Sequence, residues 1–402
     1  LATALVAGGY PSFYVTSFEP VSILKGTTRF GGTNLFTRIL LGGQFIISLL
    51  AIIMGVAFLR NGQYQRDYDL GFTTKGVIAA WVNNENGYNT YRDALSSNTD
   101  IEVLAGTKHH IANAFFNDPV KHEGIEREVD IMEVGDQYLE AMDVKLLSGR
   151  AFQKDSETDK KESVLVTEEL VRKFGWADDP IGKRLVWNDT VSLYVIGVVR
   201  NIYARALWQP IEPMMMRYVG PDKYQQVIVR TSAANVSKVN AFMEKKWKEI
   251  FPNTMYNGQM IESELQETNE INANVVTMFG FLGFFATLMT AIGVYTLVSL
   301  NIVRRMKEIG VRKVLGASVL SIAGVINKQF LIILLIAMVI GSGLGLYTAN
   351  MLMSSIWTYY LTAGLLVILF SVALLGVLAL TAAGFKSIRT AAMNPTNTLR
   401  DE

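Results

Sequence analysis

The sequence predicts an integral membrane α-helical protein with four spans plus a partial N-terminal helix, and a large α+β extracytoplasmic domain. The 402 residues are 50% hydrophobic but 18% charged, which is too apolar for a soluble enzyme and too charged for a purely membrane bundle. Residues 39–59, 271–303 and 329–385 contain no Asp, Glu, Lys or Arg, and about 20 apolar residues suffice for one crossing.

Charge is strongly segregated along the chain. Residues 60–270 carry 25 basic and 32 acidic side chains, whereas the remainder carries 12 basic and 4 acidic ones. Lys and Arg collect on the cytoplasmic side of a membrane. This distribution therefore predicts an extracytoplasmic 60–270 domain and cytoplasmic flanks. Because the large domain is acidic, no nucleic acid is expected as a partner.

The first residues resemble the end of a membrane helix more than a signal peptide. The chain begins with Leu1, and no basic residue precedes the apolar residues 1–9. The stretch FEPVSILK at 18–25 and the stretch MNPTNTLR at 393–400 both place Leu four and a basic residue five positions after Pro. We interpret residues 1–26 as the end of a preceding repeat, in a longer tandem-repeat protein.

The remaining elements follow in order. The uncharged run 329–385 is too long for one helix, and the polar aromatic stretch 354–360 divides it at the membrane interface. Gly341, Gly343 and Gly345 indicate close helix packing, although ordinary membrane-helix glycines are an equal alternative. The predicted order is a cytoplasmic linker (27–38), TM1 (39–59), the periplasmic core domain (60–270), TM2 (271–303), a cytoplasmic coupling segment (304–318), TM3 (319–352), a short periplasmic turn (353–361), TM4 (362–386) and a cytoplasmic tail (387–402).

Short strands alternate with helices in the 60–270 domain. Residues rich in Val, Ile and aromatics predict strands, and residues with helical spacing predict helices. The pattern indicates an α+β domain of one or two lobes and does not determine the strand order. Strands are predicted at 76–82, 129–134, 163–167, 191–199 and 226–230, and helices at 168–174 and 236–250.

Catalytic and metal-binding motifs are missing from the sequence. There is no cysteine, no G-x-x-x-x-G-K-[ST] phosphate loop, no serine nucleophile elbow and no H-E-x-x-H. His109 and His110 are not expected to share a metal ion, because neighbours on a strand point to opposite faces. Both are instead expected to be surface polar residues. No intrinsic enzyme activity, cofactor or metal is expected.

Two further clusters have simple structural interpretations. Asp155, Glu157 and Asp159 are expected in an exposed loop, because the glycine and the terminal Glu of a calcium loop are missing. The run 214–216, three methionines, is expected to be a half-buried strand.

The segment 304–318, RRMKEIGVRKVLGAS, is the most informative part of the chain. It is basic, and it lies between two uncharged runs. Topological anchoring of the adjacent spans explains such a cluster on its own. A short basic segment on the cytoplasmic side is also available to a cytoplasmic partner, and both roles can coexist.

The sequence resembles the MacB/FtsX-like permeases of ABC transporters, also called type VII or mechanotransmission permeases. The resemblance is carried by the stretch 307–318, by the tail 394–400 and by four parts of the soluble domain. Those four parts are MDVKLLSGRAF (142–152), SVLVTEELVRKF (163–174), PIGKRL (180–185) and VIGVVRN (195–201). No ATPase lies within this chain, which differs from the versions with a fused ATPase.

The resemblance implies a permease subunit that couples ATP hydrolysis by a separate cytoplasmic ABC ATPase dimer to movement of periplasmic domains. ATP would be bound by that partner, and the first two spans would form stalks. The implied result is efflux or extraction of a hydrophobic, lipid-linked or peptide substrate. The residues expected to contact the ATPase are Arg304, Arg305, Lys307, Glu308, Ile309, Gly310, Arg312, Lys313 and Gly316.

The resemblance also implies further partners, and two alternative functions fit the sequence. The resemblance implies the bacterial inner membrane, with the lipid bilayer, a periplasmic adaptor, lipoprotein or hydrolase, and a dimer or pseudo-dimer of permease halves as partners. One alternative function is an FtsX-like transmembrane regulator of a periplasmic cell-wall hydrolase. Another is an ATP-independent membrane receptor.

Overall fold

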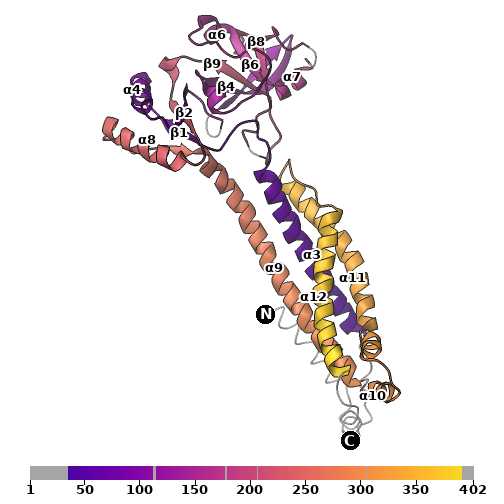
Figure 1. Ribbon diagram of the computed structural model, residues 1–402. Coiled ribbons are helices and arrows are strands. Elements are labelled where there is room, and N and C mark those ends of the chain that lie inside the picture. The colour runs from indigo at the N-terminus through magenta and orange to yellow at the C-terminus, as the bar shows by residue number, and fades with distance from the viewer. Residues whose placement is uncertain (1–34, 112–114, 177–178, 206, 305, 392–402) are drawn as a thin grey trace, which may run out of the picture. The chain divides into compact units, whose positions relative to one another are not determined.

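The computed structural model describes residues 35–111, 115–176, 179–205, 207–304 and 306–391 (Figure 1). The predicted repeat end (1–26), the linker up to residue 34 and the tail from residue 392 lie outside this part. The described residues fall into two compact units. Of the described residues, the membrane unit contains 35–53, Gly280–Leu346 and 365–391. The outer unit contains Met54–Phe279 and Tyr347–Gly364.

Four long helices carry the apolar runs. They are α3 (Leu35–Arg66), α9 (Ile261–Arg304), α11 (Val319–Ile356) and α12 (Leu365–Ala391). Each contains a stretch long and apolar enough to cross a membrane, at 38–66, 274–296, 327–356 and 365–384. The prediction of four spans is therefore confirmed for the described residues. With 44 residues, α9 is about 66 Å long, roughly twice the bilayer core.

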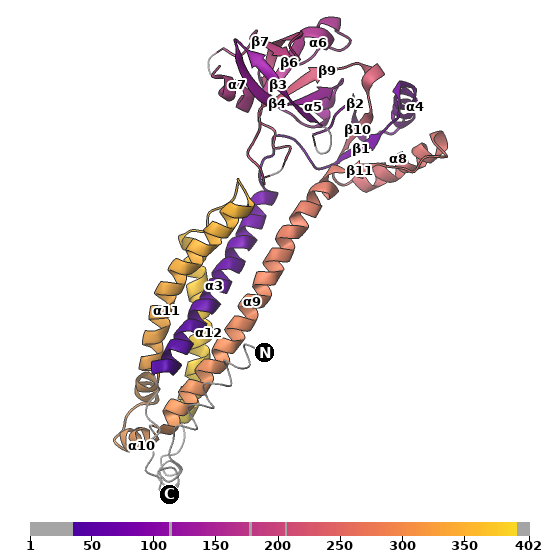
Figure 2. The same ribbon diagram turned by 180° about the vertical axis from the view of Figure 1, so that it is seen from behind.

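In the membrane unit, α3 lies beside α11 (Figure 2), and glycines of α11 lie at this contact. Gly341 and Gly345 on α11 lie against Leu49 and Ile53 of α3, where an added Cβ would come within 3.1 and 2.7 Å of side-chain atoms. Such glycines allow membrane helices to approach closely. The prediction of close packing is thus confirmed for these two glycines, whereas the space around Gly343 is open.

The outer unit contains two β lobes. The first lobe is a sheet in the order β11-β1-β10-β2, and helices α4 and α8 contribute Tyr91 and Trp247 to its core. The bounds are β1 Val77–Trp81, β2 Ile101–Thr107, β10 Gln226–Thr231, β11 Gln259–Met260, α4 Glu85–Leu95 and α8 Val236–Ile250.

The second lobe is a closed ring of six strands in the order β4-β3-β7-β8-β6-β9, which β9 closes by pairing in parallel with β4. A ring closed in this way leaves no free edge between its strands. Its strands are β3 Phe116–His122, β4 Ile125–Val134, β6 Ser163–Thr167, β7 Arg184–Trp187, β8 Val191–Val199 and β9 Met214–Tyr218; β5 Leu146–Gly149 pairs with β8. Two short helices, α6 Glu157–Glu162 and α7 Glu168–Phe174, pack on this ring, whereas α5 Tyr138–Ala141 and η1 Pro221–Lys223 contact β2 of the first lobe.

The two lobes meet where β2 pairs with β4. This pairing consists of Thr107 opposite Val134. A buried apolar cluster that includes Ala105 of β2, Met132 of β4 and Tyr138 of α5 spans the same junction. The predicted strands and helices of the domain are all present within one or two residues, except that β4 begins four residues earlier than expected.

Three local predictions were wrong. His110 is fully buried and shares a hydrogen bond of 2.9 Å between its Nδ1 and the Tyr138 hydroxyl, so it is no surface residue. Asp159 is also fully buried, in α6 rather than in an exposed loop, because Arg150 supplies the opposite charge. The three methionines 214–216 are all buried, because Met214 and Met216 pack into one apolar cluster and Met215 packs into another on the opposite face of β9.

Candidate functional site

The basic segment forms a short helix between α9 and α11. Helix α10 covers Met306–Val314. It ends at Gly316, whose φ of +86° is in the left-handed region that glycine adopts without strain. The amide of Ala317 donates to the carbonyl of Arg312 over 3.0 Å, which is the long hydrogen bond of a Schellman cap.

The next helix begins immediately afterwards. The hydroxyl oxygen of Ser318 accepts a hydrogen bond from the amide of Ser321 over 3.3 Å, and its carbonyl accepts one from the amide of Ile322. Ser318 thus acts as the N-cap of α11. With one cap ending α10 and the other starting α11, residues 315–318 form a defined turn rather than a loose linker.

One face of α10 is exposed and partly apolar. Val311, Val314 and Leu315 are 53, 66 and 81% exposed, whereas Ile309 is 6% exposed. Beside the apolar face, Arg312 and Glu308 form an ion pair of 2.8 Å one turn apart, an arrangement that stabilises an exposed helix modestly. Apolar side chains grouped at a polar rim are typical of an interaction surface.

The predicted contact residues occupy different places in this arrangement. Arg304 ends α9, and Lys307, Glu308, Ile309, Gly310, Arg312 and Lys313 belong to α10. Arg305 lies outside the described residues. Ile309 and Gly310 face inward, and Gly316 ends the helix. The roles of these residues stay predictions.

Sequence reasoning missed the apolar contribution to this face. Val311, Val314 and Leu315 recur at the i, i+3 and i+4 spacing of a helix. This spacing is present in the sequence, where the apolar residues stand among the positive charges of the segment.

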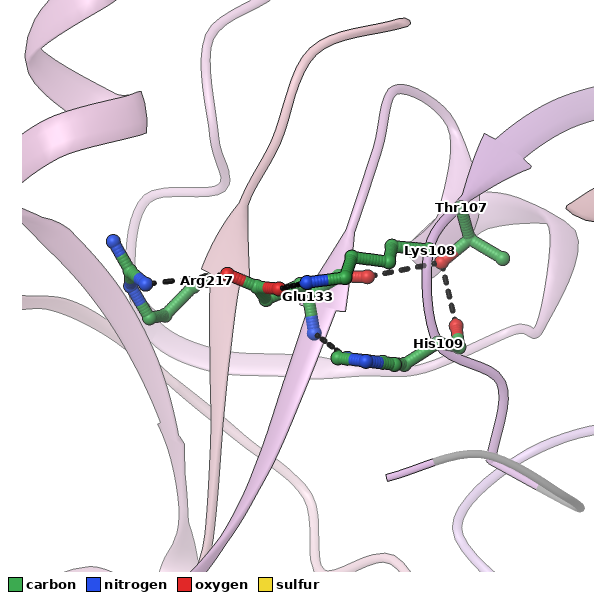
Figure 3. A network of polar contacts seen from close by, with 5 residues as sticks. All are labelled: Thr107, Lys108, His109, Glu133 and Arg217. Carbon is green, nitrogen blue, oxygen red and sulfur yellow. Dashed lines mark hydrogen bonds and ion pairs between the residues drawn. The ribbon is translucent and has the colours of Figure 1, made fainter. Parts of the chain in front are cut away.

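A second polar cluster lies in the outer unit, at the junction of the lobes (Figure 3). Glu133 of β4 is 6% exposed and lies between Lys108 on one side and Arg217 of β9 on the other. Arg217 Nη1 donates to Glu133 Oε1 over 3.2 Å. Burial by itself would raise the pKa of Glu133, but the hydrogen bond from Lys108 and both positive charges outweigh it and lower the pKa.

The backbone around Glu133 is tied to the other lobe by the same residues. The hydroxyl of Thr107 donates to the carbonyl of His109 over 2.6 Å, and the amide of Glu133 donates to His109 Nδ1 over 3.0 Å. Burial lowers the pKa of His109. In the part of the chain that the structure describes, no group of three or more acidic or histidine side chains could hold a metal ion. We interpret the cluster as a set of polar contacts that hold β2, β4 and β9 together.

Known families match both units. Residues 39–246 match the family described as MacB-like periplasmic core domain. Residues 280–395 match the family described as FtsX-like permease C-terminal. The first match alone covers more than half of the chain. The chain belongs to the MacB/FtsX-like permease family. It is therefore a membrane protein of the ABC transporter permease class with a periplasmic core domain.

Curated relatives of this permease carry export names. The Neisseria meningitidis serogroup A "Macrolide export ATP-binding/permease protein MacB" is 25% identical over 244 residues, which is 57% of this chain and 36% of that protein. The Pseudomonas syringae "Probable syringafactin export ATP-binding/permease protein SyfD" is 24% identical over 242 residues, 56% of this chain and 35% of that protein. The permease thus spans about a third of the length of these relatives.

Solved structures of similar domains also match. The periplasmic region of MacB from Actinobacillus actinomycetemcomitans has a TM-score of 0.37 and 15% identity, over 50% of this chain and 94% of that chain. The extracellular domain of the transporter YknZ from Gram-positive bacteria has a TM-score of 0.34 and 12% identity, over 45% of this chain and 98% of that chain.

Proposed function

We propose that this permease is the membrane subunit of an exporter in the bacterial inner membrane, and that a separate cytoplasmic ABC ATPase dimer docks on α10. The exposed face of Val311, Val314 and Leu315 is the observation that carries the proposal. In the sequence, α10 lies between two membrane spans, and the basic residues of this segment favour a cytoplasmic position for it. Export by curated relatives supports the reaction class.

The geometry of α10 suits it to transmit movement. An ATPase that closes on ATP pushes on the exposed face of α10. Because the caps at Gly316 and Ser318 fix the turn into α11, displacement of α10 passes to α11 rather than being absorbed by a flexible linker. On the N-terminal side of α10 the chain leads back to α9, which begins in the outer unit.

The cargo class follows from the names of the relatives and not from a site within the chain. The names of two relatives mention the export of macrolides and of syringafactin. We propose a hydrophobic or amphipathic cargo, a class that includes lipid-linked and peptide compounds. In this mechanism the cargo is moved by the outer domain, and the spans transmit force.

A charge substitution on the exposed face tests the docking. In Val314→Asp/Leu315→Asp, two exposed apolar side chains become acidic, so the fold is preserved while the apolar contact is lost. We expect recovery of the ATPase with the full protein, purified in mild detergent, to fall at least about tenfold. Met255→Asp is the matched control, because Met255 is 89% exposed in the outer unit. Undiminished recovery with the double variant would contradict the proposed docking site.

A further inference from the structure

The segment that joins β8 to β9, residues 200–213, contacts three other parts of the outer unit: the chain after α3, strand β4 and the turn between α11 and α12. We call it the connector. At its start, Arg200 pairs with Asp69 over 2.6 Å, and the amide of Tyr203 donates to the carbonyl of Leu70 over 3.0 Å. Gly71 has a φ of +82°, and a Cβ there would lie 1.8 Å from the carbonyl oxygen of Asn201. The connector is thus held closely against the chain that leaves α3.

The middle of the connector is anchored to the six-stranded ring. Arg205 binds the buried carboxylate of Asp130 on β4 with both terminal nitrogens, and the Nη2–Oδ1 distance is 2.8 Å. The same guanidinium lies 5.0 Å from the centre of the Phe115 ring. Further along, the carbonyl of Pro213 accepts a hydrogen bond from the amide of Asp130 over 2.8 Å. Movement of the connector therefore pulls directly on β4.

The turn between α11 and α12 binds the same connector. The amides of Thr358 and Tyr359 both donate to the carbonyl of Leu207, over 3.1 and 3.2 Å. The Thr358 hydroxyl donates to the carbonyl of Trp208 over 3.0 Å. In return, the amide of Ile211 donates to the Tyr359 hydroxyl oxygen over 3.2 Å. Four directional hydrogen bonds define one relative position of the two segments.

Buried aromatic rings reinforce this contact. Trp357 is 2% exposed, and its ring centre lies 5.7 Å from that of Phe58 on α3 and 5.6 Å from that of Trp208 in the connector. Tyr359 meets Tyr203 edge to face at 5.3 Å. Such pairs contribute beyond the area they bury.

The turn also binds α3 directly. The fully buried Asn61 accepts a hydrogen bond through its side-chain oxygen from the amide of Leu361 over 2.9 Å. The contacts are dense enough that Tyr347–Gly364 belongs to the compact outer unit, although the rest of α11 and α12 does not. A turn that only reversed the chain at the membrane surface would need none of these bonds.

We propose that residues 357–361 form a latch through which α11 and α12 hold the connector and, with it, the six-stranded ring. The latch is a third attachment of the outer unit to the spans, besides the chain connections through α3 and α9. Trp357 and Tyr359 are its positioning residues. In α11, one helix thus carries the α10 turn at its beginning and the latch at its end. The inference rests on the proposed function, because the ATPase supplies the movement that the latch passes on.

Hydrogen exchange on the full protein with its co-purified ATPase tests the latch. The variant Thr358→Val/Tyr359→Phe keeps side-chain shape but removes the hydroxyl bonds to Trp208 and Ile211. We expect exchange of the Ile211 amide, which loses its acceptor, to become about tenfold faster. The difference in exchange of this amide between the ATP-bound and nucleotide-free states should shrink by at least half. The control is Ser354→Ala/Ser355→Ala, whose hydroxyls bond to Met351 and Leu352 of their own helix, and it should change neither quantity.

The outcomes separate the latch from the proposed function. If the unmodified protein shows the nucleotide-dependent difference and the double variant retains it in full, the latch is overturned and the proposed function stands. The latch is likewise overturned, and the proposed function stands, if exchange of the Ile211 amide is unchanged by the double variant. If no ATPase binds the unmodified protein, both the proposed function and the role of the latch in it are overturned.

Discussion

Ser48 on α3 and Thr290 on α9 share a hydrogen bond of 2.7 Å between their hydroxyl oxygens, and both side chains are buried. Close by, the side-chain oxygen of Gln44 would lie 2.7 Å from a Cβ added at Gly293. The two spans that lead to the outer unit are therefore matched to each other by polar and small side chains within the membrane unit. These contacts therefore favour one relative position of α3 and α9.

Removal of this bond should loosen α3 from α9. We expect Ser48→Ala and Thr290→Val each to lower the free energy of unfolding in detergent, with a coupling of about 0.6 kcal/mol in a double-mutant cycle. Thr296→Val is the control, because the Thr296 hydroxyl bonds to the carbonyl of Ile292 in its own helix. Strictly additive effects of the two substitutions would show that the bond contributes nothing to this contact.

The spans could be predicted because composition alone defines them. Residues 271–303 lack every charged side chain, and this signal needs no knowledge of the partners in space. The strands at 163–167 and 191–199 have the predicted bounds because each is a run rich in Val and other residues that favour strands.

The remaining features depend on contacts between distant residues. Closure of the ring requires β9 to pair in parallel with β4, about 80 residues earlier, and no local pattern encodes that choice. Similarly, the latch brings Tyr359 to residue 211, and the burial of His110 depends on Tyr138. At the candidate site the position of the basic segment could be predicted, but which face of α10 is exposed depends on the packing of Ile309.

Gly316 offers a test of the α10 cap that does not depend on a partner. No atom lies within 4 Å of a Cβ built at this position, so the cost of a side chain comes from the left-handed backbone alone. We expect Gly316→Ala to weaken the cap by about 1 kcal/mol, seen as faster hydrogen exchange of the Ala317 amide. Gly316→Asn should exchange more slowly than the alanine variant, because Asn tolerates this conformation. Equal exchange in the two variants would contradict the strain argument.

His110 should make the outer unit sensitive to mild acid. Burial lowers the pKa of His110 to about 4, whereas an unfolded histidine has a pKa of about 6.5. Between these values the unfolded chain binds the proton and the folded chain does not. Stability therefore falls as the pH drops from 6.5 to 4, by about 3 kcal/mol for this residue.

The variant His110→Gln removes that titration. In this variant, the free energy of unfolding should differ less between pH 7 and pH 4 than it does in the unmodified protein. Unfolding in urea, followed by tryptophan fluorescence, measures this difference. His122→Gln is the matched control and should keep the full difference, because His110 is still present. A pH dependence in His110→Gln equal to that of the unmodified protein would show that His110 is not its source.

The charged form of Asp159 should stabilise the second lobe at neutral pH, and this stabilisation should be lost only below about pH 4. Its carboxylate accepts two hydrogen bonds from Arg150, each of 2.8 Å, and others from Gln153 and Ser163. The hydrogen bonds from Arg150, which outweigh the effect of burial, lower the pKa of Asp159 to about 2. A depressed carboxyl pKa contributes stability above the unfolded value, near 4, and this contribution is lost as the pH falls from 4 through 2.

The variant Asp159→Asn should therefore be less stable than the unmodified protein at pH 7 by about 2 kcal/mol. This difference in the free energy of unfolding should become smaller as the pH falls below 4, because protonation of the Asp159 carboxyl in the unmodified protein then removes the stabilising contribution of its charge. Chemical unfolding followed by tryptophan fluorescence, at pH 7 and at pH 2.5, measures both quantities. Glu157→Gln changes an exposed carboxylate of the same helix and should have little effect at either pH. A gap for Asp159→Asn that stayed constant down to pH 2.5 would mean that the lost packing, and not the charge, caused the destabilisation.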